Sequence, residues 1–500
     1  MNDVTDLVSW IDARSVLVFL VTFLAGISVS STRRRSCLPP GPLKWPLIGN
    51  LPQIFMYMRK HNSQLKMHLE LVEKYGGIYT LSPSGDDIVV VADYDLLQEV
   101  LLYRAEEFND RPSYRLGKDL FQGLGILSSS GEKWRAIKKL TAVAFRDFGV
   151  GNRKQEQIIQ EEAEIILKMM EENRGAPFDP KPLLFKAVAN VICRIIFGVR
   201  FDYEDKEFNN LLDKMNYMAK HYTPTTIDNL LPIVKYLPIT TPGKVMIKNR
   251  EEIRQYTYRK INEHRATYDK NNIRDYIDIY IKYTEEENDT AQLTEPHLFQ
   301  AILDLYFAGM ETTANTLTWL ILYLINFPEV QKKCKEEIVE VVGQSRQVCY
   351  ADKAKLPYVN ATILELQRCS NTTAFTVPHM NPETTELGGY IIPKRTLILP
   401  LVSHPHQSKK YFENPSEFWP ERWLVDGKVK KTGPFLPFGL GPHQCSGENL
   451  AKMEIFLSMT TFLQHHTFEL PEGHPKPTLE GTNTGVTVNT APYKVIFKSD

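Results

Sequence analysis

Residues 437–451 read PFGLGPHQCSGENLA, and Cys445 is the residue of this stretch on which the fold depends. Cys445 lies between glycines and shortly precedes an apolar segment, residues 450–463, so a turn should become a helix here. Backbone N–H groups and the positive end of a helix favour a thiolate at this position, and a thiolate binds iron. Taken alone, the stretch would be better explained as a buried cysteine in a glycine-rich turn. The rest of the chain argues against that explanation.

The same stretch resembles the haem-binding signature of the cytochrome P-450 superfamily, FxxGxRxCxG. The positions that match are Phe438, Gly441, Cys445 and Gly447, whereas His443 replaces the usual arginine. The resemblance implies that Cys445 is the axial ligand of haem b (iron protoporphyrin IX), where a thiolate promotes O–O cleavage. It also implies that Phe438 shields the sulfur from water. We expect His443 to contact a haem propionate with a charge that depends on pH.

A long helix is predicted over residues 295–327, because apolar and small residues recur there at helical spacing: Leu298, Ile302, Leu305, Ala308 and Thr312. Gly309 in its middle costs about 1 kcal/mol relative to alanine, which suggests close approach of a ligand. Residues 308–313 resemble the oxygen-binding segment [AG]Gx[DE]TT of the same superfamily at every position. The resemblance implies that Glu311 and Thr312 are catalytic and organise the water chain that delivers protons to dioxygen.

Further motifs resemble the superfamily's haem-propionate contacts. Trp134 and Lys138 match its WxxxR helix, with lysine in place of arginine. Lysine lacks the fork of arginine, so we expect this contact to be weaker or rearranged. Arg111 and His379 match further positions that bind the propionates.

A structural network is implied by two separate segments. Glu365 and Arg368 form an ExxR motif on one helix face, and Arg422 belongs to a PERF-like element that has Trp423 instead of phenylalanine. The resemblance implies a buried Glu–Arg–Arg network that holds the cysteine loop and does not touch substrate.

The resemblance also predicts a substrate pocket that is mostly apolar, which favours a lipophilic ligand. The residues it places around the pocket are Tyr114, Gly117, Leu127, Ser128, Phe307, Ala308, Thr373, Val377 and Val486.

The composition excludes some classes of function. The formal net charge is −1, so no basic bias indicates a nucleic-acid partner. Neither a zinc-type CxxC pair nor a phosphate-binding GxxxxGK[ST] motif is present in the sequence. The six cysteines are widely and irregularly spaced, which is typical of free thiols in a reducing compartment.

The N-terminus predicts a membrane anchor. Residues 16–27 are apolar and short for a full span, and Arg33, Arg34 and Arg35 follow them. A cleaved signal peptide has an apolar region of this length, but the position of the charges favours an uncleaved anchor with the body in the cytosol. We therefore expect an anchor over residues 1–36, a Pro-rich hinge over 37–50 and a catalytic domain over 51–500.

The resemblance covers roughly residues 38–498 and is closest to the animal microsomal enzymes that oxidise drugs, steroids and fatty acids. It implies a mainly α-helical fold with a small β-rich lobe. The implied activity is that of a monooxygenase in the endoplasmic reticulum membrane, in contact with membrane lipid. Its expected partners are an NADPH-dependent flavoprotein reductase, cytochrome b5 and a lipophilic small molecule.

Two alternatives stay open from the sequence. The first is a haem-thiolate isomerase that rearranges peroxides or endoperoxides, although such an enzyme needs no proton relay and the Glu311–Thr312 pair is intact. The second is a non-catalytic haem-binding ligand carrier, which His443 and Lys138 motivate because both replace arginine.

Overall fold

The computed structural model describes Thr22 and residues 37–499, with gaps at 47, 84–85, 113–114, 149–152, 174, 224–225, 287–291, 432 and 483–484. The predicted anchor segment and Tyr114 therefore lie outside the described residues, apart from Thr22. Within the described part of the chain, no helix has both the length and the apolar character needed to cross a membrane.

The body is mainly helical, as predicted. The larger helices are α3 (Leu51–His61), α4 (Gln64–Tyr75), α7 (Gly131–Phe148), α8 (Arg153–Glu172), α9 (Lys181–Phe197), α10 (Lys206–His221), α12 (Pro242–Ala266), α13 (Tyr276–Glu286), α14 (Glu295–Asn326), α15 (Pro328–Val341), α16 (Pro357–Ser370) and α18 (Glu448–His465). Shorter helical segments are α5 (Tyr94–Gln98), η1 (Glu99–Tyr103), η2 (Ala105–Phe108), α6 (Arg115–Phe121), α11 (Ile227–Leu230), η3 (Pro232–Tyr236), η4 (Tyr350–Lys355), α17 (His404–Gln407), η5 (Pro420–Trp423) and η6 (Gly441–His443).

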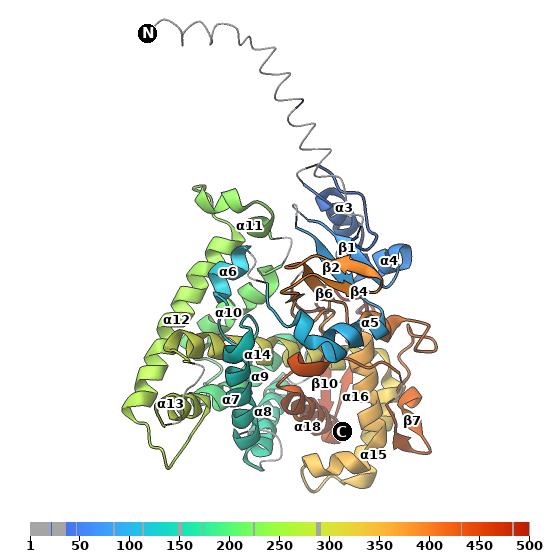
Figure 1. Cartoon of the computed structure of the whole chain (residues 1–500). Coiled ribbons are helices and arrows are strands. Elements are labelled where there is room, and N and C mark those ends of the chain that lie inside the picture. The colour runs from blue at the N-terminus through green and yellow to red at the C-terminus, as the bar shows by residue number, and fades with distance from the viewer. Residues whose placement is uncertain are drawn as a thin grey trace, which may run out of the picture.

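Helix α14 is the central element, and α9, α16 and α18 pack against it (Figure 1). It has 32 residues and is buried along most of its length, which explains why its sequence is apolar on nearly every face. Thr294 and His297 form a capping box at its start. The helix ends one residue before the predicted end, since Phe327 takes a non-helical conformation ahead of Pro328.

The β-rich lobe is a sheet in the order β1-β2-β6-β3, formed by β1 (Ile78–Leu81), β2 (Ile88–Val91), β6 (Leu397–Pro400) and β3 (His379–Met380). Strand β2 pairs antiparallel with β1 and parallel with β6, and β3 pairs antiparallel with β6. Its sequence IVVV is β-branched and buried on both faces, as suits an inner strand. The remaining strands form two-stranded pairs: β4 (Thr385–Leu387) with β5 (Tyr390–Ile392), β7 (Leu424–Val425) with β8 (Lys428–Val429), and β9 (His466–Glu469) with β10 (Ile496–Ser499).

The Pro-rich segment expected to be a hinge packs on this lobe. Leu38 is buried in the lobe's hydrophobic core. The carbonyl of Pro39 accepts the hydroxyl of Thr80 at 3.0 Å, and the carbonyl of Pro40 accepts its backbone N–H at 2.7 Å. The first residues of this segment therefore pack on the lobe, and its role as a hinge toward the anchor stays a prediction.

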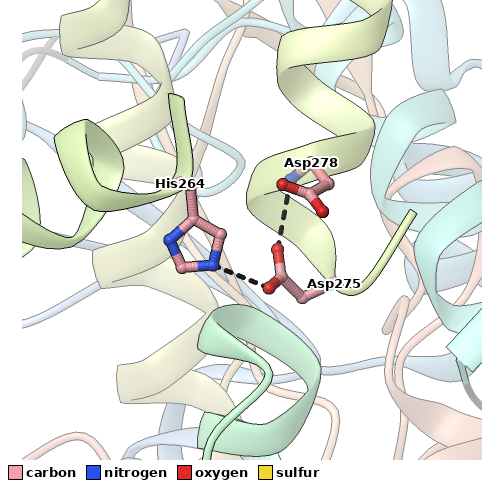
Figure 2. A group of neighbouring side chains, drawn as sticks. All are labelled: His264, Asp275 and Asp278. Carbon is pink, nitrogen blue, oxygen red and sulfur yellow. Dashed lines mark hydrogen bonds and ion pairs between the residues drawn. The ribbon is translucent and has the colours of Figure 1, made fainter. Parts of the chain in front are cut away.

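A buried polar cluster joins α12 to α13 (Figure 2). His264 Nε2 lies 2.7 Å from Asp275 Oδ2, and His264 Nδ1 lies 2.7 Å from the carbonyl of Lys260. Both ring nitrogens therefore face acceptors, so the imidazole donates from both and is positively charged. Arg274 binds both oxygens of Asp278, at 2.7 and 2.8 Å. Neither nitrogen has a lone pair for a metal ion, so the cluster serves as an ion network between two helices.

Candidate functional site

Cys445 lies where the turn of η6 leads into α18, as its sequence context predicts. Its backbone N–H donates to the carbonyl of Phe438 at 2.9 Å, and Gly447 caps the helix that starts at Glu448. Burial raises the pKa of the Cys445 thiol, while amide hydrogen bonds from Gly447 and Glu448 act in the opposite direction. A bound metal ion would add a positive charge that opposes the effect of burial and favours the thiolate.

The loop needs glycine at position 441 because of a close backbone contact. Gly441 has φ +75°, and a Cβ there would lie 1.8 Å from the carbonyl oxygen of Leu101 in η1. Gly447 is less crowded, with a Cβ position 3.9 Å from Cys445 Sγ. The signature glycine at 441 thus fastens the loop to the β-rich lobe. Phe438 is half-buried, and the ammonium of Lys452 lies 5.3 Å from its ring centroid.

The predicted propionate contacts come together beside this loop. Arg111 donates to the carbonyls of Val377 and Pro378, both at 2.8 Å, and to His443 Nδ1 at 3.0 Å. The ring of His443 lies against Trp134, with centroids 3.9 Å apart. His379 Nδ1 donates to the carbonyl of Phe108 at 2.8 Å.

Lys138 also lies beside Trp134. It donates to the carbonyl of Pro442 in the cysteine loop, and its ammonium lies 5.1 Å from the Trp134 ring centroid. Lysine at this position therefore contacts the loop backbone directly, and its expected weaker or rearranged contact with a propionate stays a prediction.

Among the described residues, Arg111 and Lys138 form no ion pair in this cluster, and two of its buried nitrogens lack a hydrogen-bond partner. Arg111 Nε and His379 Nε2 are buried without a hydrogen-bond partner among the described residues. Burial lowers the pKa of Arg111 to about 9, and burial together with Arg111 lowers that of His379 to about 3. A group with two carboxylates would supply acceptors and negative charge here. The residues present therefore fit haem, whose propionates are such groups.

The expected pH-dependent charge of His443 against a propionate stays a prediction, and the protein groups around it act against that charge. Burial and the neighbouring Arg111, His379 and Lys138 lower its pKa to about 2. Its Nδ1 accepts from Arg111, so Nε2 carries the proton and donates to Asn109 Oδ1. His443 is a neutral link between Arg111 and Asn109, and Arg111 is the cation of this pair.

On α14, Thr312 and Glu311 differ in their surroundings. The Thr312 hydroxyl donates to the carbonyl of Ala308 at 2.7 Å, so it bends back along its own helix. Glu311 is buried and accepts a hydrogen bond from Thr487 Oγ1 at 2.8 Å. Burial raises the pKa of Glu311, although Thr487 and Lys181 act in the opposite direction. A Cβ at Gly309 would lie 3.1 Å from the side chain of Ile192 in α9, so close helix packing is one reason for glycine here.

The Glu365 network is fully paired. Arg368 binds Glu365 through two bonds of 2.8 and 2.9 Å, and Arg422 Nε adds a third at 2.9 Å. The indole N–H of Trp423 donates to Glu365 Oε2 at 2.8 Å, so tryptophan supplies a bond that phenylalanine would not. Arg368 also binds the carbonyls of His406, Pro415 and Glu417, which ties α16 to the segment ahead of the cysteine loop.

Some of the predicted substrate residues lie on α14 or on a segment that contacts it. Leu127 donates its backbone N–H to Asp304 of α14 at 2.9 Å. Val488, two residues after Val486, donates to the carbonyl of Thr372, next to Thr373. The predicted residues Leu127, Ser128, Phe307, Thr373 and Val486 are half-buried, Ala308 and Val377 are exposed, Gly117 is buried against Tyr222, and Tyr114 lies outside the described residues.

Two residues near the site, Asp304 and Thr487, were not predicted from the sequence. Asp304 is buried, and it accepts backbone N–H groups of Ile126 and Leu127 at 2.7 and 2.9 Å. Burial raises its pKa to about 6. The sequence did contain a sign of its importance, because Asp304 is an acidic residue in an otherwise apolar helix. A buried acidic residue is rarely without a partner. Thr487 gave no such signal, because a threonine near the C-terminus is ordinary.

Residues 39–497 match the family model described as cytochrome P450. The chain is 36% identical to "Cytochrome P450 2A9" of Mesocricetus auratus over 479 residues, which cover 92% of this chain and 96% of the relative. It is 36% identical to "Cytochrome P450 2H1" of Gallus gallus over 486 residues, covering 96% and 98%. It is 34% identical to "Cytochrome P450 2B4" of Oryctolagus cuniculus over 491 residues, covering 96% and 99%.

These similarities and the helical fold define a haem-containing monooxygenase. The chain belongs to the cytochrome P450 family, and its relatives named above are animal cytochromes P450 of the 2 series. Its cofactor is haem, and it acts with a redox partner on a lipophilic substrate.

Proposed function

We propose that this enzyme inserts one oxygen atom from O2 into a steroid, fatty acid or xenobiotic, with electrons from NADPH delivered by a flavoprotein reductase. The observation that carries this proposal is the meeting of Cys445 with a buried cluster in which the cation Arg111 has an unpaired Nε donor and no carboxylate partner among the described residues. Arg111 Nε and His379 Nε2 belong to that cluster and lack partners among the described residues. An anionic macrocycle with an axial thiolate satisfies both halves of this arrangement at once.

We assign Cys445 as the iron ligand and Arg111, Trp134, Lys138, His379 and His443 as the residues that hold the propionates. When bound, haem supplies the activation of dioxygen, and the protein supplies the ligand, the proton path and the pocket. Gly441 keeps the cysteine loop against η1, and the Glu365 network keeps the preceding segment in place.

Glu311 and Thr312 have complementary roles in this proposal. The Thr312 hydroxyl donates to Ala308 and keeps its oxygen available to accept a hydrogen bond from water. Glu311 is a buried carboxyl whose pKa is raised by burial, which suits a group that holds and releases a proton. This pairing favours oxygen insertion over a peroxide rearrangement, which needs no proton supply.

The proposed electron donors, a flavoprotein reductase and cytochrome b5, would dock beside the cysteine loop. Arg135 and Lys139 are exposed on α7, the helix that carries Trp134 and Lys138. Because Lys138 touches the loop at Pro442, a partner on this face lies close to Cys445. Complementary charge would chiefly raise the association rate with an acidic partner.

The proposed location is the endoplasmic reticulum membrane, with the body in the cytosol. Exposed apolar side chains gather near α3, namely Leu43, Trp45, Ile48, Phe55 and Met56, and near α11 and η3, namely Leu231, Ile233, Tyr236, Leu237 and Ile239. Figure 1 shows α3 and α11 at the same end of the molecule. Apolar side chains exposed at one end support contact with lipid.

The test compares the purified protein with a Cys445→Ser variant in two measurements. The reduced carbon monoxide complex of the unmodified protein should have the Soret shift of a thiolate-bound haem, and the variant should lose it. With reductase and NADPH, the unmodified protein should oxidise a lipophile drawn from a spectral binding screen. Retention of the shift in the variant would refute Cys445 as ligand. Turnover of lipid peroxides alone would favour the isomerase, and haem binding without NADPH consumption would favour the carrier.

A further inference from the structure

Glu311 is held from one side by the C-terminal segment of the chain. Thr487 Oγ1 donates to Glu311 Oε1 at 2.8 Å, and both residues are buried. The neighbouring Val488 is fixed to α14, because its carbonyl accepts from Asn315 Nδ2 at 2.6 Å and from Trp319 Nε1 at 2.9 Å. Thr487 is therefore docked rigidly against the helix that carries Glu311.

The hydrogen bonds continue outward from Thr487. Asn489 Nδ2 donates to Thr487 Oγ1 at 3.0 Å and to its carbonyl at 3.2 Å. Lys181 Nζ, at the start of α9, donates to Asn489 Oδ1 at 2.8 Å. Paired backbone bonds of 2.8 Å between Asn489 and Thr482 fix the middle of this chain. Lys181 and Asn489 are half-buried, so the chain runs from near the surface to the buried carboxyl.

Every bond in the chain points the same way. The ammonium of Lys181 donates to Asn489, Asn489 donates to Thr487, and Thr487 donates to Glu311. Aligned donors polarise one another and stabilise negative charge at the end that accepts. The side-chain amide of Asn489 does not pass a proton along readily, so this chain does not conduct protons. It orients the Glu311 carboxyl and favours its ionised form.

The two oxygens of Glu311 are consequently unlike. Oε1 is engaged by Thr487, whereas Oε2 has no hydrogen-bond partner within the part of the chain that the structure describes. Burial raises the pKa of Glu311, and Thr487 and Lys181 oppose that effect. Burial lowers the pKa of Lys181, Glu311 and Asp179 raise it, and Lys220 lowers it further. Lys181 and Glu311 therefore favour each other's charged forms, and the hydrogen bonds through Asn489 and Thr487 connect them.

We propose that Lys181, Asn489 and Thr487 form a polarised hydrogen-bond chain that positions the Glu311 carboxyl, leaving Oε2 as the oxygen that exchanges a proton with the active-site water. This inference rests on the proposed monooxygenase function. It makes the three residues positioning residues, because they act through Glu311 and do not touch substrate.

The first test replaces Thr487 by valine, which keeps the shape and removes the hydroxyl. The matched control is Thr490→Val, a buried threonine three residues further on. The share of NADPH electrons recovered in product should fall about tenfold in Thr487→Val, the effect of one hydrogen bond to a charged group, and peroxide should rise. Thr490→Val should retain the coupling of the unmodified protein.

The second measurement follows the protonation of the Glu311 carboxyl directly and needs no enzymatic turnover. An infrared titration of the carboxyl, with Glu311→Gln subtracted, should give a higher midpoint in Thr487→Val and in Lys181→Met than in the unmodified protein. The sign follows because both changes remove stabilisation of the carboxylate. Lys181→Met also serves if Thr487→Val folds poorly.

The outcomes separate the two proposals. If the unmodified protein shows no NADPH-driven oxidation, the proposed function fails. If it is active and both Thr487→Val and Lys181→Met keep its coupling and its Glu311 midpoint, the positioning chain alone is refuted. Equal losses in Thr487→Val and Thr490→Val would also refute it, since they would reflect packing of the segment.

Discussion

The buried Glu–Arg–Arg network depends on one residue, Glu365. Its carboxylate is fully buried and accepts from Arg368, Arg422 and Trp423. A buried charge costs several kcal/mol unless it is paired in this way, so each donor matters more than a surface ion pair would. The ExxR spacing predicted the first contact from sequence. The part played by Trp423 was not predictable, because its partner lies 58 residues away and is fixed only by the fold.

We predict that Trp423→Phe destabilises the protein by about 2–3 kcal/mol, because it removes a hydrogen bond to a buried carboxylate along with some ring volume. Urea unfolding of the haem-bound protein measures the change. The control is Trp419→Phe, since Trp419 is 39% exposed and reaches Glu365 through its backbone N–H, which the substitution keeps. The control should cost about 0.5 kcal/mol or less. Equal losses would mean that the indole bond contributes nothing measurable.

Helices with a strong apolar pattern could be predicted from the sequence. Features that depend on contacts between distant parts of the chain could not. Helix α14 agrees with its predicted range to within a residue, because Thr294 and Pro328 mark its ends locally. The packing of Gly309 against Ile192 of α9 was not predictable, since Ile192 is more than a hundred positions earlier in the chain. The π-helical segment η1 has no local signal, and its contact with Gly441 exists only in the folded protein.

The His264–Asp275 contact between α12 and α13 should make the stability of the folded state depend on pH. Burial opposes the charge of His264, but its hydrogen bond to Asp275 and the charge of that residue offset this and raise the pKa of His264. A histidine with a raised pKa stabilises the folded state fully below the unfolded pKa of about 6.5, and the benefit is lost as pH rises through the folded pKa.

We therefore predict that His264→Gln costs about 2 kcal/mol near pH 5.5 and progressively less as the solution becomes alkaline. Paired denaturant unfolding curves across this range measure the difference from the unmodified protein. His474→Gln, at an exposed histidine, serves as control and should show little dependence on pH. A cost for His264→Gln that grew with pH would contradict the charged, doubly donating imidazole.

For the whole molecule, the sequence predicted the mainly helical class, the small β-rich lobe and the family. It did not predict that residues after Leu38 pack into the lobe, because a run of prolines looks the same whether it is free or docked. It also did not predict the neutral state of His443, which depends on Arg111, His379 and Lys138 together. Local motifs predicted which residues to examine, and long-range packing shifts the pKa values of those residues.

The basic face of α7 leads to a prediction about partner binding. Reversing charge with Arg135→Glu and Lys139→Glu should slow reduction by the flavoprotein about tenfold or more at low salt, and less at high salt, because exposed charges are screened. Stopped-flow reduction at several salt concentrations measures this. The control reverses Lys248 and Lys332, exposed lysines on α12 and α15. Equal slowing at every ionic strength would disfavour electrostatic attraction, and so would slowing in the control.

The contact between the Arg111 segment and the cysteine loop, which we call the seam, can form only late in synthesis. Arg111 and His443 are 332 positions apart in the chain, and Lys138 and Pro442 are 304 apart. At translation rates of about 5 to 20 residues per second, the ribosome completes the second side of this seam about 17 to 66 seconds after the first. Through that interval the nascent chain carries Arg111 and Trp134 without the loop that covers them. Capture of the cofactor therefore belongs to the last stage of synthesis, after nearly all of the polypeptide has emerged.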